Sequence, residues 1–125
     1  DDLGGNRVKV KGYETCSNLH SVWDDCLIDE TKMSRAALKD QLLQVAGSYT
    51  PDSRSILDWA TESARIAIHP RTQYCRQTDK ACLPWAARSY TLDSNYQAMN
   101  WPVAKERLAR GGYRLAGLLN AALGP

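Results

Sequence analysis

Apolar residues recur along most of the chain at the three- and four-residue spacing of an α-helix, which predicts a mainly α-helical protein. The first helix is expected over residues 17–28, with Ser17 or Asn18 as its N-cap. Its apolar stripe would consist of Leu19, Val22, Trp23 and Cys26. Before it, charged and apolar residues alternate over residues 7–11, which predicts one short strand or β-hairpin near the start of the chain, ending at Gly12.

Two more helices are expected in the middle of the chain. Ser34 would cap one that stops at Gly47, and Asp52 or Ser53 would cap the next. The inward face of the latter is expected to hold Ile56, Leu57, Trp59, Ala60, Ala64 and Ala67. It must end near His69, because the residue before a proline is biased away from helical angles.

The last helix is expected to begin near Trp101, with Pro102 in its first turn, where a missing N–H costs nothing. Its apolar face would hold Trp101, Ala104, Leu108, Leu115, Leu118, Leu119 and Ala122. Gly111 and Gly112 interrupt this helix, and a tight helix contact would explain them. Three arginines, at 107, 110 and 114, lie on one side of it, where we expect an ordinary solvated face.

The length of 125 residues suits a single domain, residues 1–125, with one core. The formal net charge of +2 is too small for a strong general field, so any binding of a phosphate polymer must be local. No apolar run is long enough to span a bilayer. Residues 1–5 do not resemble a signal peptide, so in an exported protein that segment would be removed or lie upstream.

The chain has four cysteines, which permit three pairings if all are bridged: Cys16, Cys26, Cys75 and Cys82. They form no CxxC pair, and only His20 and His69 could add imidazoles, so a cysteine-rich zinc site is disfavoured. Two local disulfides are the better interpretation. They indicate an oxidising compartment, either the periplasm or the outside of the cell.

The candidate chemistry lies at His20 and Asp24. Four residues apart on a helix, they share one face, where an imidazole and a carboxylate can hold one zinc ion and leave room for other ligands and a water. The alternative is a hydrogen bond between the two side chains on a solvated face. The four-residue spacing alone does not distinguish a zinc site from such a hydrogen bond.

Four segments of the chain form a recognisable series: Gly4-Gly5-Asn6, Asn18-Leu19-His20-Ser21-Val22-Trp23-Asp24, Trp59-Ala60-Thr61-Glu62-Ser63, and residues 107–120. In order and spacing they resemble the S1/P1 nuclease family, which carries GGN, then NLHxxWD, a W-A-x-E-S helix and a closing RLAxAGxRLAxLLN helix. The resemblance implies a helical, phospholipase C-like fold with three zinc ions. It also implies cleavage of single-stranded DNA and RNA and of 3′-nucleotides.

Carried to the matching positions, the resemblance makes His20 and Asp24 ligands of one zinc ion and places Gly5 and Asn6 beside a nucleobase pocket. An asparagine amide can both donate to and accept from a base edge, and glycine allows close approach of the backbone. The alternative for Gly4-Gly5-Asn6 is a simple turn, since glycine and asparagine are common turn residues.

The chain resembles only the C-terminal half of that family. The N-terminal half supplies most of the histidine and aspartate ligands and the catalytic aspartate, so no catalytic residue is assigned here. This chain would hold at most one partial zinc site, and His69 is expected to be a surface loop histidine. The expected partners are the N-terminal half of the same enzyme, possibly a separate chain, and single-stranded nucleic acid or nucleotides. The isolated chain is expected to be inactive.

The sequence is also compatible with two other functions. One is a zinc phospholipase C-like hydrolase, whose fold and metal site resemble this family. The other is a non-catalytic, disulfide-stapled helical module, if the chain acts alone. Arg7, Lys9 and Lys11 could touch a phosphate backbone or simply be solvated, and Trp85 is open to base stacking. The expected location is secreted or periplasmic.

Overall fold

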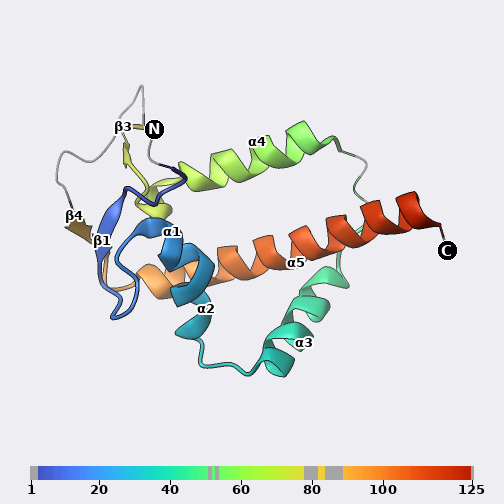
Figure 1. Ribbon diagram of the computed structural model, residues 1–125, viewed down its shortest axis with the longest axis horizontal. Helices are drawn as coiled ribbons and strands as arrows, with labels where there is room; N and C mark the ends of the chain where they lie inside the picture. Colours follow the sequence, from blue (N-terminus) through green and yellow to red (C-terminus); the bar gives the residue numbers. More distant parts are fainter. Residues whose placement is uncertain (1–2, 51, 53, 78–81, 84–88, 125) are drawn as a thin grey trace.

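The computed structural model describes residues 3–50, 52, 54–77, 82–83 and 89–124, and it is mainly helical, as predicted. Its helical elements are α1 (Leu19–Ser21), the π-helix η1 (Val22–Cys26), α2 (Leu27–Asp29), α3 (Arg35–Ala46), α4 (Ile56–Ala67), the 3-10 turn η2 (Pro70–Thr72) and α5 (Tyr96–Leu123). The strands are β1 (Lys9–Lys11), β2 (Arg76–Gln77), β3 (Cys82–Leu83) and β4 (Ser89–Thr91). In Figure 1, α5 runs through the middle of the molecule, with α4 and α3 on opposite sides and the strands near the end where α5 begins.

The strand predicted near the start forms, but its partner is not the other arm of a hairpin. β1 pairs in parallel with β4, with Val10 opposite Tyr90. On its other edge, Lys9 makes an antiparallel bridge to Asn18. Val10 is buried between two exposed lysines, so the alternating pattern did report one face turned to the core.

The core lies where β1, the first helical segment and the beginning of α5 meet. Its buried members are Val10, Cys16, Leu19, Val22, Cys26, Leu27, Leu92, Tyr96 and Ala104. Trp23 and Trp101 pack against this cluster as partly buried side chains, which agrees with the core role expected for them. Trp85 lies outside the described residues.

The first helix is one continuous segment with a widened middle. It spans α1, η1 and α2, and the N–H of Leu27 reaches back five residues to the carbonyl of Val22. A disulfide joins Cys16 to Cys26, with their Cα atoms 6.3 Å apart, and so ties the approach to the helix to the end of η1. Cys75 is disulfide-bonded as well, while the side chain of Cys82 lies outside the described residues. The expectation of a local disulfide is confirmed for the first pair.

Helix α5 starts earlier than predicted. It begins at Tyr96, so Pro102 lies inside the helix rather than in its first turn. Proline removes one hydrogen bond of the helical ladder. Burial of two side chains offsets this loss: Tyr96 and Asn100 are almost fully buried, and the Asn100 amide donates to the carbonyls of Arg71 and Tyr96 at 3.0 Å each. Long-range packing therefore decides where this helix begins.

Large apolar faces stay uncovered among the described residues. Neither α3 nor α4 contains a buried residue, and Ile56 and Leu57, expected to face inward, are 70% and 75% exposed. Apolar residues of the later part of α5 are exposed too: Leu108, Leu115, Leu118, Leu119 and Leu123. The tight contact expected at Gly111 and Gly112 is absent here, since a Cβ at either would meet nothing within 4 Å. No helix in the described ranges combines the length and apolarity needed to cross a membrane.

The cap of α4 also differs from the prediction. Ser55 caps it, and Asp58 completes a reciprocal capping box. Asp52 instead forms ion pairs with Arg54 and Arg114 at 2.9 and 2.8 Å, and Ser53 lies outside the described residues. The side chain of Asp52 therefore serves a tertiary contact rather than the helix start.

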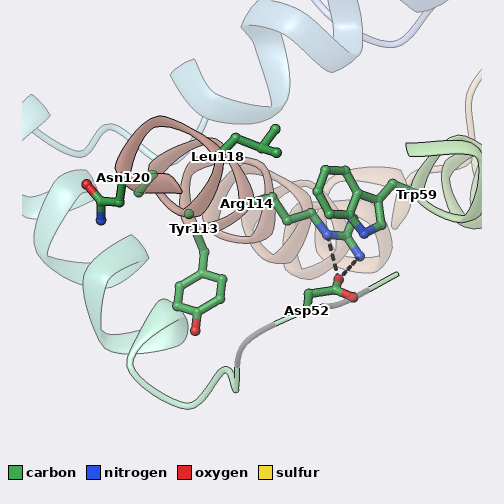
Figure 2. A pocket seen from close by; sticks show the side chains of 8 residues that line it. Asp52, Trp59, Tyr113, Arg114, Leu118 and Asn120 are labelled. Carbon is green, nitrogen blue, oxygen red and sulfur yellow. Dashed lines mark hydrogen bonds and ion pairs between the residues drawn. The ribbon is translucent and has the colours of Figure 1, made fainter. Parts of the chain in front are cut away.

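An ion-pair network joins α4 to α5. The prediction that the arginines of α5 form an ordinary solvated face is therefore wrong. Arg114 is only 7% exposed, and its guanidinium contacts Asp52 and Glu62 at 2.8 Å each. Arg107 also pairs with Glu62. Figure 2 shows the Arg114 guanidinium between the Asp52 carboxylate and the Trp59 indole, whose centroid is 4.9 Å away. The network is one of the links between α5 and α4, a helix with no buried residue.

The network predicts loss of stability in acid. Burial of Glu62 acts to raise the pKa of its carboxyl, but hydrogen bonds and charges from Arg114 and Arg107 outweigh burial and lower the pKa from 4.5 to about 2. A carboxyl whose pKa is lower in the folded state than in the unfolded chain stabilises the fold at pH values above the unfolded-state pKa. This stabilisation is lost as the pH falls from about 4.5 towards 2. We therefore expect the melting temperature to fall across that window, and to fall less steeply in Glu62→Gln. The control Asp40→Asn, which removes an exposed carboxyl from α3, should keep the wild-type dependence of melting temperature on pH. Identical pH profiles for Glu62→Gln and wild type would contradict this assignment.

Candidate functional site

His20 and Asp24 are positioned by the start of the first helix. Asn18 caps it: its side-chain oxygen accepts from the N–H of Ser21 at 2.9 Å, and the Ser21 hydroxyl donates to the Asn18 carbonyl at 2.9 Å. His20 lies in α1 and Asp24 in η1, on the same face. Their side chains are 44% and 61% exposed, so both are open to a ligand.

Both nitrogens of the His20 ring have an oxygen partner. Nδ1 lies 3.1 Å from the carbonyl oxygen of Gly4, and Nε2 lies 2.9 Å from Oδ2 of Asp24. A carbonyl only accepts, so Nδ1 donates a proton to Gly4. A backbone carbonyl therefore orients the ring. Nε2 is thereby directed at the Asp24 carboxylate. Nε2 and Oδ2 of Asp24 need a second proton or a metal ion between them, because a bare imidazole nitrogen and a carboxylate oxygen both accept.

The turn before β1 brings that carbonyl to the histidine. Gly4 and Gly5 have φ values of +64° and +92°, in the region that favours glycine. A Cβ on Gly5 would come within 3.2 Å of the backbone nitrogen of His20. The turn can therefore approach the first residues of α1 this closely only with glycine at that position.

The donor atoms fit part of a zinc site. Tetrahedral zinc, with bonds of about 2.0–2.2 Å to imidazole nitrogen and carboxylate oxygen, places two ligand atoms roughly 3.3–3.6 Å apart. The observed 2.9 Å between Nε2 and Oδ2 therefore needs to open by about half an ångström. A carbonyl on the opposite ring nitrogen is the usual support for a zinc-binding histidine. Within the described residues no group of three histidine, cysteine, aspartate or glutamate side chains gathers, so a zinc ion at this pair would need ligands from outside those residues.

A pocket of about 460 Å³ opens beside this pair. The turn, the first helix, α4 and the segment after η2 all contribute to its lining: Gly4, Gly5, Leu19, His20, Trp23, Asp24, Ala64, Ile66, Ala67, Ile68, Thr72 and Tyr74. Most of these groups are apolar, and the imidazole and carboxylate stand among them. The pocket thus pairs a small polar centre with an apolar wall, as ligand sites commonly do.

Hydrogen bonds from the core hold this pocket together. The indole N–H of Trp23 donates to the Tyr96 hydroxyl at 3.0 Å, and that hydroxyl donates to the Thr72 carbonyl at 2.7 Å. The Thr72 hydroxyl in turn donates to the Ala67 carbonyl at 2.7 Å, at the end of α4. The first helix, α5 and α4 are therefore linked at the pocket through buried groups.

Sequence reasoning missed the wall that α4 provides. Ala64 and Ala67 were expected to face a core, and they face the pocket instead. Their place on an apolar stripe was the available signal, but periodicity does not distinguish a core from a pocket wall.

The other candidate residues divide into those at the pocket and those away from it. Gly5 lines it, as expected for a residue beside a ligand. Asn6 does not: it is exposed, and its amide donates to the Leu3 carbonyl at 3.0 Å within the turn. His69 lies at the start of η2, outside this pocket, where it caps the turn by accepting from the N–H of Arg71.

The sequence of the chain also matches those of known proteins. The model of the S1/P1 Nuclease family matches residues 1–124, nearly the whole chain. The chain belongs to the S1/P1 nuclease family. It is similar to Endonuclease 3 of Arabidopsis thaliana, with 32% identity over 126 residues, which cover 95% of this chain and 42% of that protein. Endonuclease 2 of the same plant is 29% identical over 130 residues, covering 98% of this chain and 44% of the relative.

The S1/P1 match therefore concerns a part of the longer relatives, since the chain spans less than half the length of both. No solved structure matches the chain. The matched range contains the glycine turn, the His20–Asp24 pair and the α4 wall, so all the described parts of the pocket fall inside the S1/P1 segment.

Proposed function

We propose that this chain is the C-terminal part of a zinc-dependent S1/P1-type nuclease that hydrolyses single-stranded DNA and RNA and removes phosphate from 3′-nucleotides. The observation that carries the proposal is the His20–Asp24 pair, with its Nδ1–H held by the Gly4 carbonyl, at the mouth of an apolar-walled pocket. The family match over residues 1–124 supports the class of reaction. The relatives named as endonucleases support the same class.

The residues of this chain would bind and orient rather than carry out proton transfer. Nε2 of His20 and Oδ2 of Asp24 would hold one zinc ion, and the Gly4 carbonyl would keep the imidazole in the coordinating tautomer. Zinc, when bound, supplies a Lewis acid that polarises phosphoryl oxygens and makes water acidic enough to react near neutral pH. Gly5 would let a base or sugar approach the backbone, and Asn6 would contact a base edge once its amide leaves the turn.

The rest of the enzyme would supply the remaining ligands and cover the uncovered helices. Exposed apolar side chains on α3, α4 and α5 offer a surface of the kind that folded proteins usually bury: Leu43, Ile56, Leu57, Leu108, Leu115, Leu118, Leu119 and Leu123. The relatives are more than twice as long as the aligned segment. We therefore propose that the N-terminal half of the same enzyme binds this surface. We also propose that the chain is inactive without that half.

The disulfide between Cys16 and Cys26 supports a secreted or periplasmic location. Disulfides persist in those compartments and are rare in a reducing cytosol.

The proposal predicts a zinc-containing enzyme with a preference for single strands. We expect the full-length protein to purify with bound zinc and to cleave single-stranded DNA and RNA and 3′-nucleotides faster than duplex DNA or a phosphatidylcholine analogue. A chelator should abolish cleavage, and added zinc should restore it. Elemental analysis and a substrate panel, run beside the isolated chain, provide the measurement. Cleavage that survives chelation, or a preference for the lipid analogue, would overturn the proposal.

A further inference from the structure

A second pocket adjoins the first, because Ile66 lines both. It has a volume of about 510 Å³ and lies between the end of α4, η2 and α5. Its lining consists of Arg65, Ile66, His69, Arg71, Pro102, Val103 and Glu106. Two guanidinium groups and an imidazole thus meet a short apolar wall, next to the candidate zinc ligands.

The charge balance of this second pocket is positive. Among the described ion pairs, none involves Arg65 or Arg71. Glu106, the carboxylate in the lining, is already paired with the guanidinium of Arg110 at 2.5 Å and lies 3.8 Å from that of Arg107. Two arginine charges therefore remain for a ligand, and guanidinium groups suit the geometry of phosphate oxygens.

The neutral imidazole of His69 adds one hydrogen-bond donor, its Nε2–H group. Its Nδ1 accepts from the backbone N–H and from Nε of Arg71, both at 3.2 Å. A nitrogen that accepts two hydrogen bonds carries no proton, so the proton of the neutral ring sits on Nε2. The same contacts hold the Arg71 side chain against the ring. The imidazole and the guanidinium are therefore placed together before any ligand binds.

We propose that Arg65, His69 and Arg71 form a second phosphate-binding subsite, which holds the backbone of a single-stranded nucleic acid whose reacting phosphate lies at His20 and Asp24. The proposal rests on the nuclease function proposed above. A strand that continues beyond the reacting phosphate has further phosphates to place in the adjoining pocket, whereas a mononucleotide has none. Pro102 and Val103 would lie against a sugar or base. With a net charge of only +2 on the chain, binding of a phosphate polymer depends on local clusters such as this one.

Removing the two charges should weaken binding of long strands and flatten its salt dependence. For single strands, each phosphate contact contributes a slope of about −0.7 to the plot of log affinity against log salt. In the full-length enzyme, Arg65→Gln/Arg71→Gln should therefore flatten that slope by about 1.4 and lower affinity on the order of tenfold at low salt. Hydrolysis of a 3′-mononucleotide should stay within about twofold of wild type, since that substrate does not reach the subsite. Fluorescence anisotropy with a labelled single-stranded oligonucleotide measures the slope.

Two matched variants separate this effect from a general loss of charge. Arg65→Lys/Arg71→Lys keeps both charges and should retain the wild-type slope. Arg35→Gln/Lys39→Gln removes two exposed charges from α3 and should also retain it. An unchanged slope in Arg65→Gln/Arg71→Gln, or equal losses on the oligonucleotide and the mononucleotide, would overturn the subsite while the nuclease function stands. A wild-type protein that binds the strand with the expected slope but never cleaves it would overturn the nuclease function and keep the subsite.

Discussion

Replacing His20 by alanine is expected to lower the rate of nucleic-acid cleavage by the full-length enzyme more than about 100-fold, because loss of a mere supporting partner of a metal ligand already costs about 10–100-fold. The variant loses Nε2, the nitrogen that faces Oδ2 of Asp24 at 2.9 Å. Asp24, an exposed carboxylate, would then be the one ligand that this chain is proposed to supply, and a site that lacks a ligand holds zinc weakly. The zinc content should fall together with the rate, and Asp24→Ala should produce the same pair of losses.

The chain contains two histidines, so a matched control is available. His69→Ala removes the imidazole at the start of η2, which lies outside the candidate zinc pocket, and should leave the zinc content unchanged. Elemental analysis of both variants, together with cleavage assays of His20→Ala over a range of added zinc, provides the measurement. A His20→Ala enzyme with full zinc and full rate would show that the assignment of this ligand is wrong.

Replacing Arg114 by alanine should destabilise the full-length protein by about 3 kcal/mol, near the lower end of the range of about 3–5 kcal/mol for breaking a buried ion pair. The guanidinium is buried and bridges Asp52 and Glu62, and its face lies over the Trp59 ring. The lower end applies because both carboxylates keep a contact with Arg54 after the change, at 2.9 Å each. The apolar stem of the arginine would also be lost from its packed position.

Denaturant unfolding of three variants tests the role of Arg114. Arg114→Ala should show the full loss, and Arg114→Lys should show less, since lysine keeps the charge but cannot contact both carboxylates with a planar fork. Arg35→Ala, at the exposed start of α3, should change stability by no more than about 0.5 kcal/mol. If Arg114→Ala were as mild as Arg35→Ala, the network would contribute little to holding α4 on α5.

The parts of the fold that sequence predicted well depend on neighbouring residues. Asn18 and Ser34 cap their helices as expected, because a side chain and the amides it caps are three residues apart. The contact of His20 with Asp24 is equally local, since residues four apart on a helix face each other. Whether the pair binds zinc stays a prediction, which the His20→Ala variant tests.

The predictions that were wrong concern places where segments far apart in the sequence come into contact. The sequence predicts too late a start for α5 because Pro102 resembles a first-turn proline, while burial of Tyr96 and Asn100 favours an earlier start. The charge pattern predicts solvent-exposed arginines on α5, because the pattern alone does not reveal that Asp52 and Glu62 lie opposite Arg114. Both errors come from contacts between residues that are far apart in the chain.

By itself, the sequence determined the helical class, the caps, the placing of His20 beside Asp24 and the family of the protein. Only the tertiary structure decided that the Gly4 carbonyl orients His20, that α4 walls the pocket, and that β1 pairs with β4. The physical reason is that capping and helical facing are set by bonds within one turn of chain. The other contacts form only when burial of the core offsets the entropy of closing long loops, and local periodicity carries no record of which segments then meet.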